Sequence, residues 1–456
     1  MAPFQDLPLD ILPPIISQLT DRKDWHACAL VSKVFNRVAT PLLYRTLDSR
    51  IISKTLVHHP STTLLQKPKL ANYVRHVTET GAIHRNLLVR YPNITEDTLA
   101  ALALCTNLRS MTWIDDTSSS STGAILLAFL DVIRKLPLRE LTIRTHSDLG
   151  ETVWSQLVTL TGLRKVSIWC MEGPPRVLQG WSEPLGSTLT HLELGRCAGV
   201  PPTILITVLS QLPLLVDLRL KGAPASAIPT ILTYLPNLQS LDTEYLLSGS
   251  GYSRPRVYLP STKDDDEDDT EAKDPPLPVL RHLTVRTSSM DNFGPHKLWR
   301  WIGELVPRPG LETFRLHAFT FNMGYTGIPR MFILDAAIAH GDTLKHFIVG
   351  EASLTLKDIE CLCSKFPKLE TIVCSVASAD VDSIIEAIAG ARNLQTLKIQ
   401  VQWIPNGGMQ SRGPVFTLED AIRMTRRTEE SKIRTIAIGR FQYTVCPFAA
   451  YSNGHV

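Results

Sequence analysis

Residue types that catalyse reactions or bind metals occur in this sequence, but their spacing matches no familiar catalytic or metal-binding motif. Cys361-Leu-Cys363 is too closely spaced for a CxxC metal pair and lies on a helical pattern, so both thiols are expected in a hydrophobic core. His58-His59 stands before Pro60 in a polar stretch and is expected on the surface. No GxxxxGK(S/T) loop, GxSxG turn or HExxH helix occurs, and no spacing of Ser, His and Asp indicates a triad. We therefore expect no enzyme active site, no cofactor and no metal.

Basic and aromatic residues at fixed positions of a repeated pattern are better candidates, because they suit binding. These residues are Arg144, Trp169, Arg219, Lys221, Arg286, Arg315, His317 and Lys398. A tryptophan beside arginines is typical of a protein-recognition hot spot. Acidic residues at the same positions stop after Glu244, so Arg286, Arg315 and Lys398 are expected to be unopposed. The hypothesis is that they hold an acidic or phosphorylated segment of a protein substrate. The alternative is a solvated mixture of charges without a dedicated role.

The elements that position these residues come from a repeat of the form apolar, two variable, apolar, one variable, apolar. Good copies are Leu138-Arg-Glu-Leu-Thr-Ile143 and Leu189-Thr-His-Leu-Glu-Leu194. Copies begin at residues 108, 138, 163, 189, 215, 238, 280, 311, 344, 369, 394 and 433. Six of the eleven intervals between them are 23 to 26 residues long, which indicates a regular architecture. The alternating end of each copy predicts a short strand with one buried face.

Helical patterns lie between the predicted strands, at 123–136, 297–306, 330–339, 356–366, 379–389 and 418–425. Stacked copies would bury the apolar faces in an α/β solenoid, with a parallel strand ribbon on one side and helices outside. The pattern resembles a leucine-rich repeat array over roughly residues 70–440, a resemblance that implies a horseshoe. Cys197 occupies the Asn/Cys position of the best copy, but His146, Met171 and Ala223 stand there in others, so an irregular solenoid is expected.

Stretches without apolar periodicity divide the repeat region. Loop insertions are expected at 117–122, 248–278 and 405–414, within a repeat domain at 51–440 that is followed by a C-terminal tail at 441–456. The second insertion carries an acidic run at 263–274. That run either solubilises the chain or competes within the molecule for the basic residues.

Residues 1–50 do not follow the repeat and predict a separate domain of three short helices. The first helix has an apolar stripe made of Ile11, Leu12, Ile15, Ile16 and Leu19, and further helical patterns lie at 24–35 and 39–47. Three helices of this length are too small for an independent core. A partner or the first repeats must therefore cover the apolar surface.

The string Leu7-Pro8, Asp10-Ile11-Leu12 and Leu30-Val31-Ser32-Lys33-Val34-Phe35 resembles an F-box, and with the repeats it resembles the F-box/leucine-rich-repeat proteins of fungi. The resemblance implies docking onto the Skp-type adaptor of a cullin–RING (SCF-type) ubiquitin ligase, with the repeats holding a protein substrate. The adaptor-binding residues would then be Leu7, Pro8, Ile11, Leu12, Leu30, Val31 and Phe35. The alternative is that these residues only pack the helices on the first repeat. Pro13-Pro14 and Trp25 depart from the family pattern, and the proline pair is expected to restart or kink the first helix.

Composition argues against some classes of partner. The 47 basic and 44 acidic residues give a net charge of +3, too balanced for an obligate nucleic-acid binder. No apolar run is long enough for a membrane span, and the first residues lack a secretory signal pattern, so no membrane partner is expected. Eight dispersed cysteines indicate a reducing compartment, the cytoplasm or the nucleus.

Together these patterns predict a non-catalytic substrate-recognition subunit of an SCF-type ligase. The alternative is an F-box scaffold that does not direct ubiquitin transfer.

Overall fold

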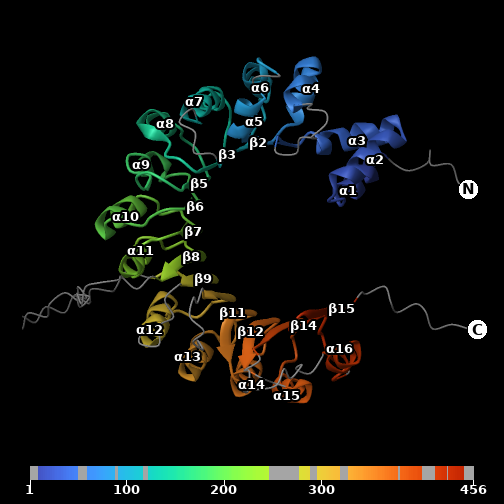
Figure 1. Ribbon diagram of the computed structural model, residues 1–456, viewed down its shortest axis with the longest axis vertical. Coiled ribbons are helices and arrows are strands. Elements are labelled where there is room, and N and C mark those ends of the chain that lie inside the picture. Colours follow the sequence, from blue (N-terminus) through green and yellow to red (C-terminus); the bar gives the residue numbers. More distant parts are fainter. Residues whose placement is uncertain are drawn as a thin grey trace, which may run out of the picture. The chain divides into compact units, whose positions relative to one another are not determined.

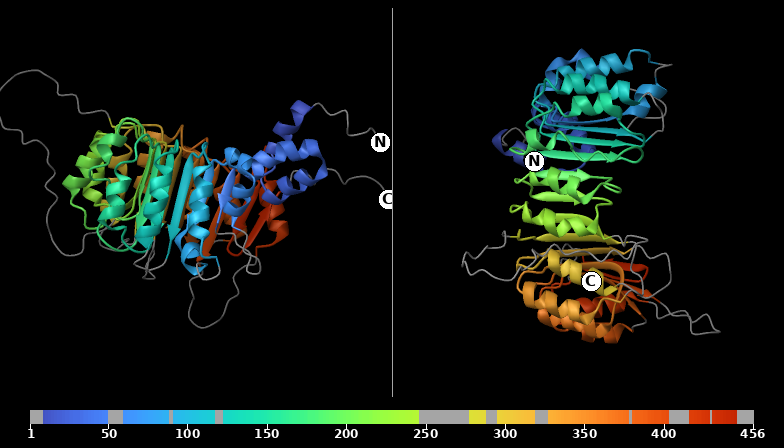
Figure 2. Two further views of the ribbon diagram at one scale, coloured as in Figure 1. Left: turned by 90° about the horizontal axis from the view of Figure 1, so that it is seen from above. Right: turned by 90° about the vertical axis from the view of Figure 1, so that its left-hand side faces the viewer.

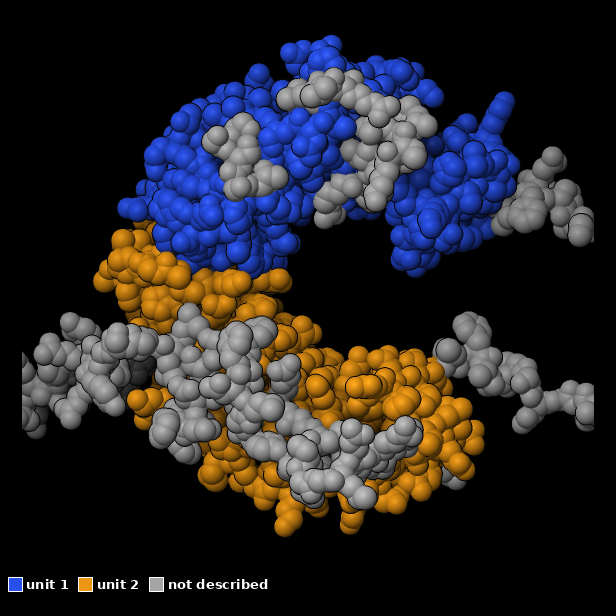
Figure 3. Space-filling view, in the orientation of Figure 1, with its two compact units in different colours: residues 1–197 blue, residues 198–456 orange. Residues whose placement is uncertain are grey.

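A computed structural model of the chain describes residues 9–49, 59–87, 91–116, 122–245, 277–287, 295–318, 327–377, 380–402, 416–428 and 430–445. The chain forms two compact units, Met1–Cys197 and Ala198–Val456 (Figures 1 and 3). Their boundary lies inside the repeat domain predicted at 51–440. Leu7, Pro8 and nearly all of the three predicted insertions lie outside the described residues.

Unit 1 begins with helices and continues with alternating strands and helices. A 3-10 turn at Leu9–Ile11 precedes α1 (Leu12–Ser17), α2 (Arg22–Val31) and α3 (Lys33–Leu43). The later helices are α4 (Pro60–Gln66), α5 (Gly81–Asn86), α6 (Ile94–Ala103), α7 (Thr122–Ile133), α8 (Gly150–Leu157) and α9 (Ser182–Leu185), with a 3-10 turn at Pro68–Tyr73. The strands are β1 (Thr46–Asp48), β2 (His76–Thr80), β3 (Ser110–Asp115), β4 (Glu140–Thr145), β5 (Lys165–Cys170) and β6 (His191–Leu194).

Unit 2 repeats the alternation. Its helices are α10 (Pro202–Ser210), α11 (Ile228–Thr233), α12 (Pro295–Leu305), α13 (Arg330–His340), α14 (Leu356–Lys365), α15 (Val381–Ala387) and α16 (Leu418–Thr425), with a 3-10 turn at Ala225–Ala227. Its strands are β7 (Asp217–Leu220), β8 (Ser240–Tyr245), β9 (His282–Thr287), β10 (Thr313–Ala318), β11 (His346–Leu354), β12 (Thr371–Ala377), β13 (Thr396–Gln402), β14 (Thr435–Ile438) and β15 (Phe441–Thr444).

The first three helices form a small bundle. Ile16, Ala29 and Ala39 are its buried centre, and the half-buried Trp25 and Phe35 pack against them. The prolines at 13 and 14 lie in the first turn of α1, where a missing N–H costs no helical hydrogen bond. The helix therefore restarts after the 3-10 turn, as the proline pair predicts.

Strands within each unit pair side by side in chain order. Pairing is parallel from β1 to β6 in unit 1 and from β7 to β14 in unit 2. Alternate residues are buried: Leu141, Val166 and Leu192 stand opposite one another on β4, β5 and β6 and are almost inaccessible. Figures 1 and 2 show helices α4 to α9 along one face of the strands of unit 1.

The mixed α/β fold with N-terminal helices and parallel strands confirms the predicted fold class at that level. The leucine-rich type of the repeat and the domain limits stay predictions. Residues 441–444, expected in a tail, form β15, which pairs antiparallel with β14.

A polar cluster lies in the core of unit 1, and it corrects one expectation. His59 is only 6% exposed rather than on the surface. Oε2 of the buried Glu79 lies 3.5 Å from Nε2 of both His59 and the fully buried His84. Nδ1 of His59 accepts a hydrogen bond from the Ser61 N–H, so Nε2 carries the hydrogen that faces Glu79. The pairing of His59 with Glu79 explains its burial.

The two histidines keep Glu79 ionised. Burial by itself raises the pKa of Glu79, but the interactions with His59 and His84 outweigh burial and bring the pKa to about 2, from 4.5. Because the pKa is depressed in the folded state, the stabilisation from Glu79 is fully present above its unfolded-state pKa. It is lost as the pH falls from about 4.5 toward 2.

We predict that Glu79→Gln lowers the free energy of unfolding at pH 7 by on the order of 3 kcal/mol, from the size of the pKa shift. Urea unfolding at a series of pH values measures the difference between wild type and variant. The difference is expected to shrink as the pH falls from about 4.5 toward 2. A difference that is independent of pH down to 3 would contradict the assignment.

Candidate functional site

One candidate surface is the exposed apolar part of the N-terminal bundle. Leu30 and Val31, at the end of α2, are 73% and 67% exposed, and Val34 follows at the start of α3. Ile11 and Ile15, one helical turn apart at α1, are also exposed. Exposed aliphatic side chains of this size on helices suit docking into an apolar groove of a partner.

The predicted adaptor-binding residues divide into two groups. Ile11, Leu30 and Val31 are exposed, whereas Leu12 is 5% exposed and Phe35 packs against the bundle core. Leu12 and Phe35 therefore support the helices that present the others. Ile15 and Val34 complete the exposed set. Ile15 belongs to the predicted apolar stripe of the first helix and Val34 to the F-box-like string, but neither was predicted to bind the adaptor.

A second candidate surface is the outward side of the strands in unit 1. Arg144 on β4 stands opposite Trp169 on β5, and its guanidinium lies 5.7 Å from the centroid of the indole. This is the geometry of a cation–π pair. Gly195 follows β6, and a Cβ atom there would lie 2.2 Å from Cδ2 of Trp169. The indole therefore lies against the backbone at Gly195, which only glycine permits.

The outward side of the strands in unit 2 carries ion pairs, and these correct the expectation that Arg286 is unopposed. The Arg286 guanidinium on β9 donates two hydrogen bonds to Asp242 on β8, at 2.7 and 2.9 Å. Arg219 on β7 is paired with Asp217 of the same strand at 3.2 Å, and Lys221 is exposed just after it. Much of the basic charge in this region is therefore neutralised locally.

Positive charge remains farther along unit 2. Neither Arg315 on β10 nor Lys398 on β13 has an acidic partner among the described residues. Strand register places Ile348 and Val373 between them, so the row reads Arg315, Ile348, Val373, Lys398. Neighbouring strands are about 4.8 Å apart, so three steps span roughly 14 Å. This basic–apolar row suits a short segment with acidic residues at both ends.

His317 lies next to this row on β10. Burial and the positive charges of Arg286 and Arg315 lower the pKa of His317 below its ordinary value of 6.5, although Asp242 opposes them. The ring is therefore neutral at pH 7. It offers a hydrogen bond rather than a charge to a ligand.

The described residues form neither a metal-binding cluster nor a membrane-spanning helix. The described residues contain no group of three His, Cys, Asp or Glu side chains arranged to hold a metal ion. Cys363 on α14 is buried, which raises the pKa of its thiol to about 12, and Cys361 is half-buried. No helix in the described part of the chain is long and apolar enough to cross a membrane.

Comparisons with known proteins agree with part of this picture. Residues 4–50 match the family model described as F-box-like. No curated protein shows significant sequence similarity to the chain. A chain in the crystal structure of the Rad7 and Elc1 complex from yeast matches with a TM-score of 0.41 and 12% identity, covering 92% of this chain and 100% of that one. A chain in the Toll–Spatzle complex from Drosophila matches with a TM-score of 0.29 and 11% identity, covering 87% and 54%. At these values neither structural similarity bears on function.

The close contact between Trp169 and Gly195 can be tested by a double-mutant cycle. We predict that Gly195→Ala lowers the free energy of unfolding by about 1–3 kcal/mol, because the new methyl group displaces the indole. In a Trp169→Ala background the same change should cost much less, since the indole is absent. Chemical denaturation of the four proteins gives the coupling energy. Equal costs in the two backgrounds would show that the contact is not formed.

Proposed function

We propose that this chain is a substrate-recognition subunit of an SCF-type ubiquitin ligase. The observation that carries the proposal is the F-box-like match of residues 4–50, directly followed by tandem strand–helix repeats. The exposed apolar side chains on α1, α2 and α3 support it, because an isolated bundle of this size would otherwise leave them in water. The proposed role is to bind and hold; no residue set for a bond-making step is proposed.

The N-terminal bundle is proposed to dock a Skp-type adaptor. Leu30, Val31 and Val34 are the proposed central anchors, since they lie close together in the chain where α2 meets α3. Ser32 caps α3 by accepting a hydrogen bond from the Phe35 N–H, which fixes the turn that presents them. Ile11 adds a contact at α1, and Leu7 and Pro8 remain candidates by resemblance alone.

The repeats are proposed to bind a protein substrate through their outward strand residues. In unit 2, the row from Arg315 to Lys398 would take two acidic or phosphorylated residues. An extended chain covers about 3.3 Å per residue, so these acids would stand roughly four positions apart, with apolar residues between them. In unit 1, Arg144 and Trp169 would hold an apolar or aromatic side chain.

Two linked binding events explain how a non-catalytic chain could promote a reaction. A substrate held by the repeats and a ligase held by the bundle share one polypeptide, so the concentration of substrate lysines near the charged enzyme rises. The gain requires simultaneous binding at both surfaces. Loss of either surface should therefore abolish the effect on the substrate without changing the other binding event.

We predict that Leu30→Asp weakens binding of a purified Skp-type adaptor by at least about tenfold, because a carboxylate would enter an apolar groove. The fold should persist, since Leu30 is exposed. Ile338→Asp is the matched control, because Ile338 on α13 is 86% exposed and lies outside the bundle. Biolayer interferometry with the three proteins measures the affinities. Equal binding by Leu30→Asp and wild type, or no binding by wild type, would refute adaptor docking.

We predict that Arg315→Glu combined with Lys398→Glu reduces capture of peptides that carry two acidic or phosphorylated residues about four positions apart. Charge reversal turns attraction into repulsion at both ends of the row, so a loss of at least about tenfold is expected. A peptide array probed with the purified chain gives the measurement. Arg308→Glu combined with Arg392→Glu reverses two exposed arginines outside the strands and so matches the change in net charge. If this control loses as much binding as Arg315→Glu combined with Lys398→Glu, the attraction is nonspecific and the site is misplaced.

A further inference from the structure

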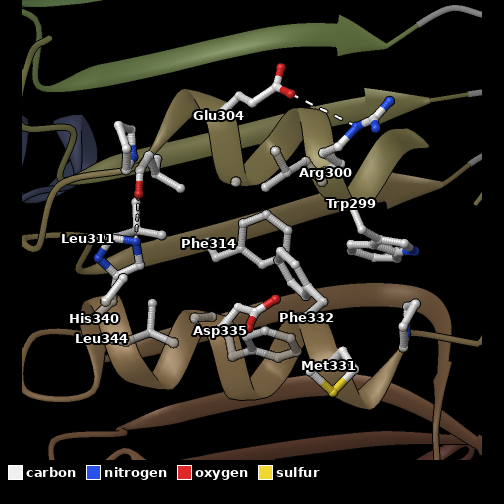
Figure 4. Close-up of a pocket in the computed structure, with 18 residues that line it drawn as sticks. Trp299, Arg300, Glu304, Leu311, Phe314, Met331, Phe332, Asp335, His340 and Leu344 are labelled. Atoms are coloured by element: carbon white, nitrogen blue, oxygen red, sulfur yellow. Dashed lines mark hydrogen bonds and ion pairs between the residues drawn. The ribbon is translucent and has the colours of Figure 1, made fainter. Parts of the chain in front are cut away.

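Unit 2 contains a pocket of about 630 Å³ between α12 and α13, with β10 and β11 at its base (Figure 4). Helix α11 packs against α12, and α13 packs against α14. Helices α12 and α13 are in less extensive contact with each other than either of these pairs. The volume falls in the range that holds drug-sized ligands. The pocket is thus a gap between α12 and α13. In the neighbouring repeats the corresponding space is closed, because the helices there pack together.

The pocket interior is aromatic. The ring centroids of Trp299 and Phe332 are 4.6 Å apart, those of Phe332 and Phe314 are 5.5 Å apart, and those of Phe314 and Phe347 are 5.6 Å apart. Figure 4 shows Trp299 and His340 at opposite ends of this row. The charged lining residues Arg300, Glu304 and Asp335 are exposed, so they lie at the rim. Such an interior favours a flat, uncharged molecule.

Two buried polar atoms of the lining residues lack partners. Nε2 of His340 is 3.1 Å from the carbonyl oxygen of Val306, which can only accept, so Nε2 carries the hydrogen. Burial lowers the pKa of His340, which keeps the ring neutral and leaves Nδ1 as an acceptor. Neither this Nδ1 nor the Trp299 Nε1 donor has a hydrogen-bond partner among the described residues. These two atoms leave one acceptor and one donor available at the two ends of the pocket.

We propose that this pocket binds an uncharged, mainly apolar ring compound of drug size. The rings of Trp299, Phe314 and Phe332 would stack against the ring system of this compound. The assignment is independent of adaptor docking, because it uses only residues of unit 2.

Gly303 on α12 allows a direct test. It lines the pocket, and a Cβ atom at this position meets nothing within 4 Å, so a larger side chain can occupy the opening without moving the backbone. Gly303→Phe should therefore fill the site and leave the fold intact. Ile338→Phe is the matched control, since it adds a ring to an exposed position of α13 that does not line the pocket.

The probe is N-phenyl-1-naphthylamine, an uncharged aromatic amine whose emission rises in apolar surroundings. Titration of the full chain should give saturable one-to-one binding in the micromolar range, unchanged in Ile338→Phe and at least tenfold weaker in Gly303→Phe. The unfolding midpoint of wild type should rise with probe concentration, as linkage requires. Failure of the wild type to bind saturably, or equal affinity in Gly303→Phe, would overturn the proposal. If Gly303→Phe does not fold, Ala339→Leu on the opposite wall replaces it with the same expected loss.

Discussion

Backbone pairing between successive strands is the constraint on which each unit depends. A strand of three to nine residues cannot satisfy its own backbone groups or cover its apolar face, so it needs the strands of the repeats before and after it. Parallel pairing in chain order then decides which side chains meet. Residues about 25 positions apart become neighbours, which is how Arg144, Trp169 and Gly195 come to form one contact. Every binding surface proposed for the repeats is made from several short segments in this way.

The N-terminal bundle is stabilised differently from the repeats. Its buried centre consists of one isoleucine and two alanines, with larger side chains only partly covered around them. A core this small leaves many aliphatic side chains at the surface. The incompleteness that makes the bundle a poor independent domain also makes it a suitable docking module.

The sequence predicted the strands well because alternation is a local property. Every copy of the repeat from residue 108 onward coincides with a strand, since burial of every second residue leaves a direct trace. Contacts between repeats produce no comparable pattern in the sequence. Arg286 meets Asp242 across 44 positions because a long guanidinium side chain reaches over to the preceding strand. His59 is buried because Glu79 stands opposite it, a fact that neither residue signals alone. The separation of α12 from α13 depends on how side-chain volumes fill the space between them, which periodicity does not encode.

The last strand, β15, has a consequence for solubility. An edge of a parallel sheet carries unpaired N–H and C=O groups in the orientation that another parallel strand would need. Because β15 runs antiparallel to β14, it forms hydrogen bonds with those N–H and C=O groups. The edge that faces solvent is then the edge of a strand that runs in the opposite direction. It is also only four residues long. A parallel strand from a second molecule therefore finds the free edge of β14 already paired, and only the four-residue outer edge of β15 is left for such a contact.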